Sequence, residues 1–222
     1  MGTALGRSAF AGPVLEMAPR LLGAVLHHDG VSLRITEVEA YGGAEDPGSH
    51  AYRGPTPRTR PMFGPPGHLY VYLSYGIHRC VNVVTGAPGE GAAVLLRAGE
   101  VCQGLDRAEQ RRLRPGARPP SPVQLARGPG NLARAVGLGA THDGADLCGP
   151  HAQVWVEGPP EQVAGAVRTG PRVGVSGPGG SGERYPWRFW LAGEPTVSAY
   201  RAGTRKVDRA EQHPPARKDQ DR

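Results

Sequence analysis

The sequence predicts a single α+β domain in which a curved antiparallel β-sheet is flanked by helices and carries a protruding β-hairpin. Three observations support this fold class. Apolar runs at 31–41, 68–75, 79–85 and 91–96 are typical of strands, and turn residues separate them. Patterns with helical spacing precede and follow these runs. A chain of 222 residues is long enough for one sizeable core, and nothing in it requires a second domain.

The predicted domain covers residues 13–199 and follows an N-terminal extension at 1–12. Residues 200–222 are highly charged and lack a series of core residues, so we expect a disordered tail. The 34 glycines and 23 prolines punctuate the apolar runs instead of forming one biased block. A loop-rich globular domain is therefore predicted.

The formal net charge of +6 and the isoelectric point near 9.6 favour a polyanionic partner. The two lysines, Lys206 and Lys218, both lie in the tail, so arginine supplies the basic side chains of the body. Arginine suits bidentate phosphate contacts, but a genomic preference for arginine codons explains the same bias.

The three cysteines indicate a reduced compartment. Cys80, Cys102 and Cys148 are odd in number and form no C-x-x-C pair, which argues against a disulfide framework and against a zinc knuckle. Charged residues such as Arg7 and Glu16 interrupt the N-terminus, so no signal peptide is predicted, and no run is long enough to cross a membrane. We therefore expect a cytoplasmic protein.

The first predicted helix covers 13–24, where Leu15, Ala18 and Leu22 have helical spacing. Pro19 can only kink this helix or mark its boundary. We expect the helix to pack over the sheet.

The first hairpin joins 23–28 to 31–41 through an Asp-Gly dipeptide, which tolerates positive φ. His27 and His28 precede the turn. Adjacent strand residues face opposite ways, so a shared metal ion is not expected, and surface positions are predicted for both.

The loop at 42–67 is too long and too rich in glycine and proline to be a passive connection, which indicates a functional role. It contains His50, Arg58 and Arg60. A histidine in a loop is usually just solvated, whereas the two arginines could contact phosphate.

The clearest hairpin joins 68–75 to 79–85 and has Tyr75, Ile77 and His78 near its tip. Exposed apolar side chains at a turn reduce solubility unless something covers them. They either fold back onto the core or enter a partner. The next strand, at 91–96, is predicted to end in Arg97, which either stays at the sheet edge or contacts phosphate.

The second half of the chain predicts a charged helix at 105–114 and a helix that begins near Pro129. Further strands are predicted at 153–157, 171–175 and 187–191. They complete the α+β arrangement.

A candidate site follows from the alternation of the strands. Glu39 and Tyr41 should project from one side, and Tyr70 and Tyr72 should share a face of the next strand. A carboxylate beside aromatic rings and an arginine-bearing loop indicates a pocket for a flat, cationic ring attached to a polyanion. A purine base in nucleic acid fits this description.

Several segments match a known family: EVEAY (37–41), His50, TPR (56–58), MFGPPGHLYVYLSYGIHRCVNVV (62–84), AVLLRA (93–98), GPGNL (128–132) and PRVGV (171–175). They resemble the alkyladenine DNA glycosylase family, the mammalian type of 3-methyladenine DNA glycosylase, which also occurs in bacteria. The resemblance extends from about residue 13 to about residue 198.

The resemblance implies a monofunctional DNA glycosylase that initiates base excision repair. Such an enzyme flips alkylated or deaminated purines out of duplex DNA and hydrolyses the N-glycosidic bond with an activated water. Glu39 would activate the water, and Glu37 would be secondary. Without the family match, both acids read as salt-bridge partners on an ordinary strand. No lysine lies near Glu39 to form a Schiff base with an opened sugar, so a lyase step is not expected.

The resemblance also assigns the other site residues. The base would be bound by Tyr41, His50, Tyr72 and Asn82, with Asn82 limiting which purines fit. Tyr75 would fill the gap left by the flipped nucleotide, and the DNA backbone would be contacted by Arg58, Arg60 and Arg97. No metal and no cofactor are implied, and the enzyme is expected to act as a monomer on double-stranded DNA at the nucleoid.

Two other functions remain open. A lesion-sensing protein that binds DNA without cleaving it would have the same charge and pocket. A zinc deaminase also flips bases, but its H-x-E and P-C-x-x-C patterns are absent from this sequence.

Overall fold

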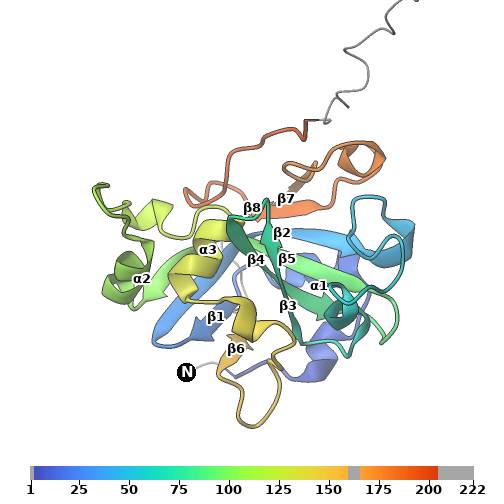
Figure 1. The fold of residues 1–222 in the computed structure, drawn as a ribbon, viewed down its shortest axis with the longest axis horizontal. Helices are drawn as coiled ribbons and strands as arrows, with labels where there is room; N and C mark the ends of the chain where they lie inside the picture. Colours follow the sequence, from blue (N-terminus) through green and yellow to red (C-terminus); the bar gives the residue numbers. More distant parts are fainter. Residues whose placement is uncertain (1–2, 160–165, 205–222) are drawn as a thin grey trace, which may run out of the picture.

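The computed structural model describes residues 3–159 and 166–204 of the chain. Its centre is an eight-stranded antiparallel sheet (Figure 1). The main path has the strand order β3-β4-β5-β2-β1-β6, while β8 pairs with both β2 and β7. The strands are β1 (Val25–His28), β2 (Val31–Gly42), β3 (Leu69–Ser74), β4 (His78–Thr85), β5 (Ala92–Gln103), β6 (Val154–Glu157), β7 (Val167–Gly170) and β8 (Arg188–Leu191). The predicted α+β fold is confirmed.

Strand β2 organises the sheet because it pairs with β1, β5 and β8. The predicted turn before it is present, with φ values of 41° at Asp29 and 71° at Gly30. Its register against β5 shifts between Ser32 and Leu33 and on both sides of Glu37. Such irregularities bend a strand and increase its twist, which curves the sheet around the acidic residues.

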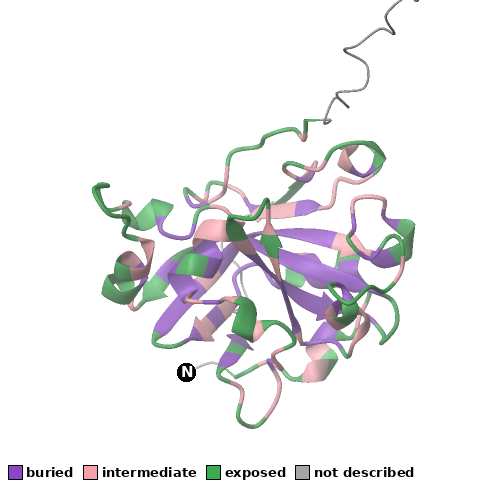
Figure 2. Ribbon diagram, in the orientation of Figure 1, coloured by how far each residue is buried: buried purple, intermediate pink, exposed green. Residues whose placement is uncertain are grey.

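The period-two alternation of the strands gives the sheet two different sides. On one side, apolar residues such as Val38, Val94 and Leu96 join the main hydrophobic core. The residues that alternate with them, among them Glu39 and Arg97, therefore project from the opposite side. The buried residues follow the strands in Figure 2.

In the part of the chain that the structure describes, three α-helices flank the sheet, namely α1 (Val14–Arg20), α2 (Leu105–Arg112) and α3 (Pro129–Val136). Helix α1 packs against β2, and α3 packs against β4 and β5, with α2 beside α3 (Figure 1). The apolar residues of α1 and α3 belong to the same core as those of the strands. Pro19 lies in the last turn of α1, which ends at Arg20, so the helix is shorter than predicted.

Two strand predictions were wrong. Residues 171–175 form no strand; β7 ends just before them at Gly170, and Gly174 has a φ of 73°. The proline at 171 has no amide hydrogen to donate to a ladder. Strand β5 does not end at Arg97 but continues to Gln103. A charged residue inside this strand is possible because a buried carboxylate pairs with it.

The prediction of surface positions for the histidines before the first turn was also wrong. His28 is buried, and its Nδ1 lies 2.9 Å from the carbonyl oxygen of Val136. His27 is partly buried and stacks on Trp155, with 4.9 Å between the ring centroids. Both rings are covered because β1 lies inside the sheet, between β2 and β6.

The described parts of both predicted terminal segments contact the domain. Phe10 lies in the main core, and the amide of Leu5 donates to the carbonyl oxygen of Val156 at 2.8 Å. Arg201 accepts a hydrogen bond at its carbonyl from Gly174. The predicted disorder beyond this point concerns 205–222, which lie outside the described residues. Within the described ranges, no helix is both long and apolar enough for a membrane span.

Candidate active site

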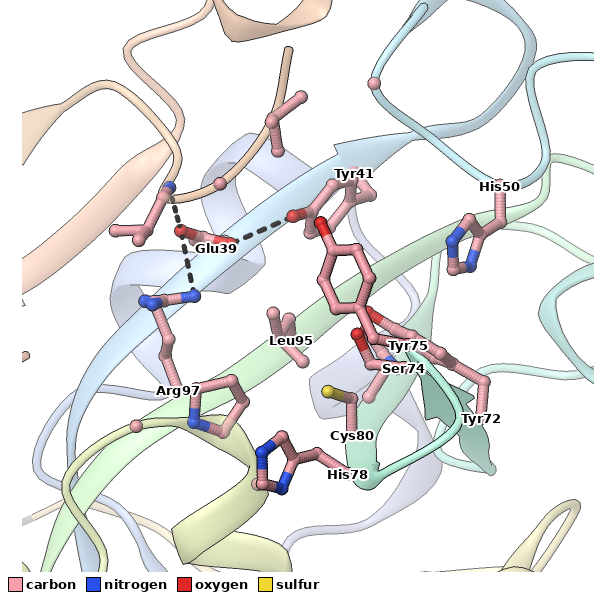
Figure 3. A pocket seen from close by; sticks show the side chains of 18 of the residues that line it. Glu39, Tyr41, His50, Tyr72, Ser74, Tyr75, His78, Cys80, Leu95 and Arg97 are labelled. Atoms are coloured by element: carbon pink, nitrogen blue, oxygen red, sulfur yellow. Dashed lines mark hydrogen bonds and ion pairs between the residues drawn. The ribbon is translucent and has the colours of Figure 1, made fainter. Parts of the chain in front are cut away.

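A pocket of about 820 Å³ opens on the side of the sheet that does not face the main core (Figure 3). Its floor contains a row of directly paired residues from four strands, Tyr70 of β3, Asn82 of β4, Leu95 of β5 and Glu39 of β2. The loop between β2 and β3, the start of α3 and a segment after β7 provide further walls. Four neighbouring strands and three connecting segments thus build one cavity.

Glu39 is fully buried, and its carboxylate is held by donors from three parts of the chain. The Tyr41 hydroxyl donates to Oε2 at 2.9 Å, and the Val173 amide donates to Oε1 at 2.7 Å. An Arg97 nitrogen lies 3.4 Å from Oε1 (Figure 3). A buried charge persists only when such partners replace its hydration. The prediction that Glu39 and Tyr41 project from one side of β2 is confirmed.

Glu37 lies on the same side of β2, two residues earlier, but in different surroundings. Its Oε1 accepts from Arg188 at 2.6 Å and from Arg97 at 3.1 Å, and its Oε2 accepts from the Ser198 amide at 2.7 Å. It is fully buried and does not line the pocket. Glu37 is thus a structural ion-pair partner, whereas Glu39 borders the cavity.

Arg97 connects these two carboxylates. Its guanidinium bonds Glu37 and lies beside Glu39, and its side chain is almost fully buried. The two carboxylates raise the pKa of Arg97 despite the opposing effect of burial, so the guanidinium stays charged. Arg97 lines the pocket, but it already has two protein partners for its charge.

Aromatic rings form the wall opposite the acid. The rings of Tyr70 and Tyr72 stack with centroids 5.5 Å apart, so the predicted shared face is confirmed. His50 meets Tyr72 edge-on at 4.6 Å, and its Nδ1 lies 3.1 Å from the Tyr70 hydroxyl oxygen. Burial, together with the nearby Arg58, lowers the pKa of His50 below its ordinary 6.5. The imidazole is therefore neutral at pH 7.

Asn82 lies at the base of this wall and is buried. Its Nδ2 donates to the carbonyl oxygen of Tyr70 at 2.9 Å, which ties β4 to β3 under the aromatic rings. The amide is therefore fixed in orientation, and a ring in the pocket would meet a rigid polar edge at this point.

Arg172 is a residue of this site that the sequence did not reveal. It is fully buried, forms two hydrogen bonds with Asp46, and donates to the carbonyl oxygens of Ala40 at 3.0 Å and Gly179 at 2.7 Å. Its guanidinium lies 4.6 Å from the ring centre of Tyr41. The residue therefore supports the Tyr41 ring and the start of the segment that donates to Glu39.

Two further pocket residues could have been found from the strand pattern. Leu95 precedes Arg97 by two positions, and Cys80 precedes Asn82 by two, so each shares a side with a predicted site residue. Burial raises the pKa of the Cys80 thiol and the pKa of the Tyr72 hydroxyl, so both stay protonated. For Arg172 the strand pattern was misleading, because 171–175 was predicted to be a strand and has no regular structure.

The tip of the β3–β4 hairpin projects into solvent. Tyr75 is 87% exposed and Ile77 is 74% exposed, so neither folds back onto the core. Tyr75 has a φ of 49°, in the left-handed region that a large side chain rarely adopts. It also lines the pocket (Figure 3). Of the two alternatives for these side chains, the outward one is present.

The structure gathers most of the predicted site residues around one cavity. The residues that line it are Glu39, Tyr41, His50, Arg58, Tyr72, Tyr75, Asn82 and Arg97. Arg60 does not line it; its side chain is exposed at the start of a short 3-10 helix, Arg60–Phe63. Within the described ranges, no group of three or more histidine, cysteine or acidic side chains is arranged to hold a metal ion.

Fold and site together define a class of protein. A basic α+β domain whose pocket combines a buried acid with stacked tyrosines is typical of an enzyme that acts on a base of a nucleic acid.

Comparison with known proteins specifies the family. The profile of the methylpurine-DNA glycosylase family matches residues 8–195, and the chain belongs to this family. Several bacterial relatives carry the provisional name 3-methyladenine DNA glycosylase. The relative from Leifsonia xyli is 52% identical over 201 residues, covering 88% of this chain and 92% of its own. The relative from Streptomyces avermitilis is 52% identical over 211 residues, covering 91% and 94% respectively.

Proposed function

We propose that this protein is a DNA glycosylase that hydrolyses the N-glycosidic bond of 3-methyladenine and related alkylated purines. One observation carries this proposal above the others. A buried carboxylate, Glu39, with three defined partners, borders an aromatic pocket whose mouth carries an exposed tyrosine. In this arrangement the acid can act at the bond to the sugar, the rings can bind the base and the exposed tyrosine can enter the duplex.

Glu39 removes a proton from the attacking water and stabilises the positive charge that develops on the sugar. Tyr41, Val173 and Arg97 keep its carboxylate in place. Burial and the adjacent Glu39 raise the pKa of Tyr41 well above its ordinary 10, so the phenol remains a hydrogen-bond donor. Arg97, for which the sequence predicted a phosphate contact, acts here through its ion pair with Glu39.

The base lies among Tyr41, Tyr72 and His50. Alkylation at N3 or N7 makes the purine cationic, and stacking and cation–π attraction contribute roughly 0.5–2 kcal/mol per aromatic contact. The neutral imidazole of His50 does not repel this cation. Asn82 presents its fixed amide at the base edge and limits which purines fit.

The DNA partner is a duplex with a damaged or deaminated purine. Tyr75 enters the duplex and fills the space of the flipped nucleotide. Arg58 and Arg60, both exposed on the loop between β2 and β3, contact phosphates. The product is an abasic site in an intact strand, formed without a cofactor by a monomer.

The test is Glu39→Gln. The amide keeps the shape of the side chain but cannot accept a proton at neutral pH, so release of 3-methyladenine from methylated duplex should fall by at least about 100-fold. Binding of the duplex should persist in a gel-shift assay. Glu16→Gln, an exposed change on α1, is the control and should leave base release unaltered.

Two outcomes would contradict the proposal. Full activity of Glu39→Gln would remove this acid from the reaction. A wild-type protein that binds methylated duplex but generates no abasic sites would be a lesion sensor instead of an enzyme.

A further inference from the structure

A second cavity of about 550 Å³ lies on the other flank of the β3–β4 hairpin. We call it the basic cleft, and its lining residues are Ile77, His78, Arg79, Arg112, Arg114, Pro115, Gly130, Asn131, Arg134 and Leu138. The active-site pocket contains Tyr75 but not Ile77, and the basic cleft contains Ile77 but not Tyr75. The two exposed apolar side chains of the hairpin tip therefore belong to different cavities.

The hairpin separates these cavities at a close contact with α3. His78, Gly130 and Asn131 border both of them. A Cβ atom added at Gly130 would lie 2.8 Å from the Cβ of His78, so the base of the hairpin abuts the start of α3 directly. The hairpin is thus a partition between the aromatic cavity that contains Glu39 and a cavity lined by arginines without an acid.

The charge of the basic cleft is not neutralised. Four arginines line it and no acidic side chain does, and in the described part of the chain none of the four forms an ion pair. Arg112 and Arg134 donate to backbone carbonyl oxygens, which fixes their positions. Burial and the neighbouring Arg134 and Arg114 lower the pKa of Arg112, as expected for cations gathered without a counter-ion.

We propose that the basic cleft binds the phosphate backbone of the complementary DNA strand. This inference rests on the proposed function, in which Tyr75 enters the duplex and the damaged nucleotide occupies the active-site pocket. A side chain that fills the space of a flipped nucleotide lies between the backbone of the damaged strand and the complementary strand. Since the damaged strand supplies the nucleotide on the Tyr75 face, the Ile77 face meets the opposite strand, and arginine forks there match its phosphates.

The test compares duplex with single-stranded DNA. A short duplex with a central abasic-site analogue and the same strand alone are titrated with wild type and with the Arg79→Gln/Arg114→Gln variant over a range of salt concentrations. These two arginines are chosen because neither holds a described backbone group. Duplex affinity should fall severalfold, and the slope of log affinity against log salt should decrease by about 1 per arginine. Affinity for the single strand should not change.

Controls separate this effect from loss of charge or of folding. The Arg20→Gln/Arg107→Gln variant removes two charges from exposed residues outside both cavities and should bind duplex like wild type. Arg79→Lys/Arg114→Lys keeps the charge and should recover most of the duplex affinity. Thermal unfolding of each variant checks that it is folded. Arg114→Gln alone changes a residue of an exposed loop and should reduce duplex affinity by a smaller factor than the double variant.

Three results would overturn the proposal. Equal losses on duplex and single strand would place the damaged strand in the basic cleft, and unchanged binding to both would remove DNA from it. A stronger duplex defect in the Arg20→Gln/Arg107→Gln control would make the effect one of total charge. None of these measurements requires base release, so a failure of the glycosylase proposal would be detected separately, as wild-type binding without catalysis.

Discussion

Arg172 contacts several parts of the site without lining the cavity. Its guanidinium is bonded to Asp46 and to two backbone carbonyl oxygens, and it packs against the ring of Tyr41. The next residue in the chain, Val173, donates its amide to Glu39. Arg172 is therefore in a position to hold two of the three partners of the proposed catalytic acid.

Replacing Arg172 with Gln should damage both stability and catalysis. Asp46 would remain buried without its cation, which costs about 3–5 kcal/mol of unfolding free energy in comparable pairs. Denaturant unfolding measures this loss. Single-turnover base release from the folded fraction should slow, because Tyr41 and Val173 lose their support.

Lysine at the same position is the informative contrast. Arg172→Lys keeps a cation beside Asp46 but cannot form the same fork of hydrogen bonds or stack on Tyr41 in the same way. It should recover part of the stability and less of the rate. An equal recovery of both would mean that Arg172 stabilises the fold without orienting the acid.

The lowered pKa of His50 predicts a pH dependence of stability. Below pH 6.5 the imidazole takes up a proton more readily in the unfolded chain than in the folded protein. The free energy of unfolding is therefore fully retained above pH 6.5 and falls as the pH drops toward the pKa of His50 in the folded protein. His142, whose pKa burial also lowers, adds a similar dependence.

His50→Gln isolates the contribution of His50. The variant removes the titrating group, so the difference in unfolding free energy between wild type and variant should shrink as the pH falls from 7 toward 5. His142→Gln serves as a comparison at a site away from the pocket. A difference that stays constant with pH would show that His50 does not titrate in the predicted direction.

At the scale of single residues, the sequence predicted where the two acids lie but not why they differ in role. Period two places Glu37 and Glu39 on one side of a strand, and the family resemblance selected Glu39. The sequence did not show why the two acids have different roles. Arg188 and Ser198, which hydrogen-bond Glu37, come from the distant C-terminal region.

At the scale of elements, the β3–β4 hairpin combines exposure with backbone strain. Tyr75 has a φ of 49°, which costs a large side chain roughly 1–2 kcal/mol relative to glycine. It is 87% exposed, so little packing energy offsets this cost in the free protein. A strained, exposed aromatic residue is a reason to look for its role in a complex.

Tyr75→Gly should separate stability from function. Glycine adopts a positive φ without steric cost, so the unfolding free energy should stay equal or rise by up to about 1 kcal/mol. Base release from duplex DNA should fall strongly, while release from single-stranded DNA, in which no gap has to be filled, should fall less. A loss of stability in this variant would show that Tyr75 packs against the domain after all.

The strands of the site were predictable and their registration was not. Apolar alternation located β2 to β5, and it correctly paired Tyr70 with Tyr72 on one face. The row from Tyr70 to Glu39 depends on the registers of three strand pairs, and the bulges around Glu37 set one of them. Bulges need cross-strand contacts that a single sequence does not display.

At the scale of the whole molecule, the site is a product of the entire domain. Donors to Glu39 come from β2, from β5 and from the segment after β7, which lies more than 130 residues further along the chain. The fold class followed from length and pattern alone. The sequence did not predict that the C-terminal segment packs against the two acids, since residues 171–175 belong to no helix or strand with a regular period.

The distribution of lysine predicts the last step of the reaction. Glycosylases that also cut the backbone use an amine as the nucleophile, which forms a Schiff base with the opened sugar. Here the two lysines are Lys206 and Lys218, so a chain that ends at residue 204 has none. This shortened chain keeps every contact described for Glu39 and should release 3-methyladenine at the wild-type rate.

Borohydride trapping tests this directly, since it converts a Schiff base into a stable covalent link. With the shortened chain, whose N-terminal amine is acetylated to remove the remaining primary amine, no protein–DNA product should form, and the strand should stay intact until alkali is added. A trapped product would require an amine that this chain does not possess. A trapped product with the full chain alone, also acetylated at its N-terminus, would assign a lyase activity to Lys206 or Lys218, which the arrangement around Glu39 gives no reason to expect.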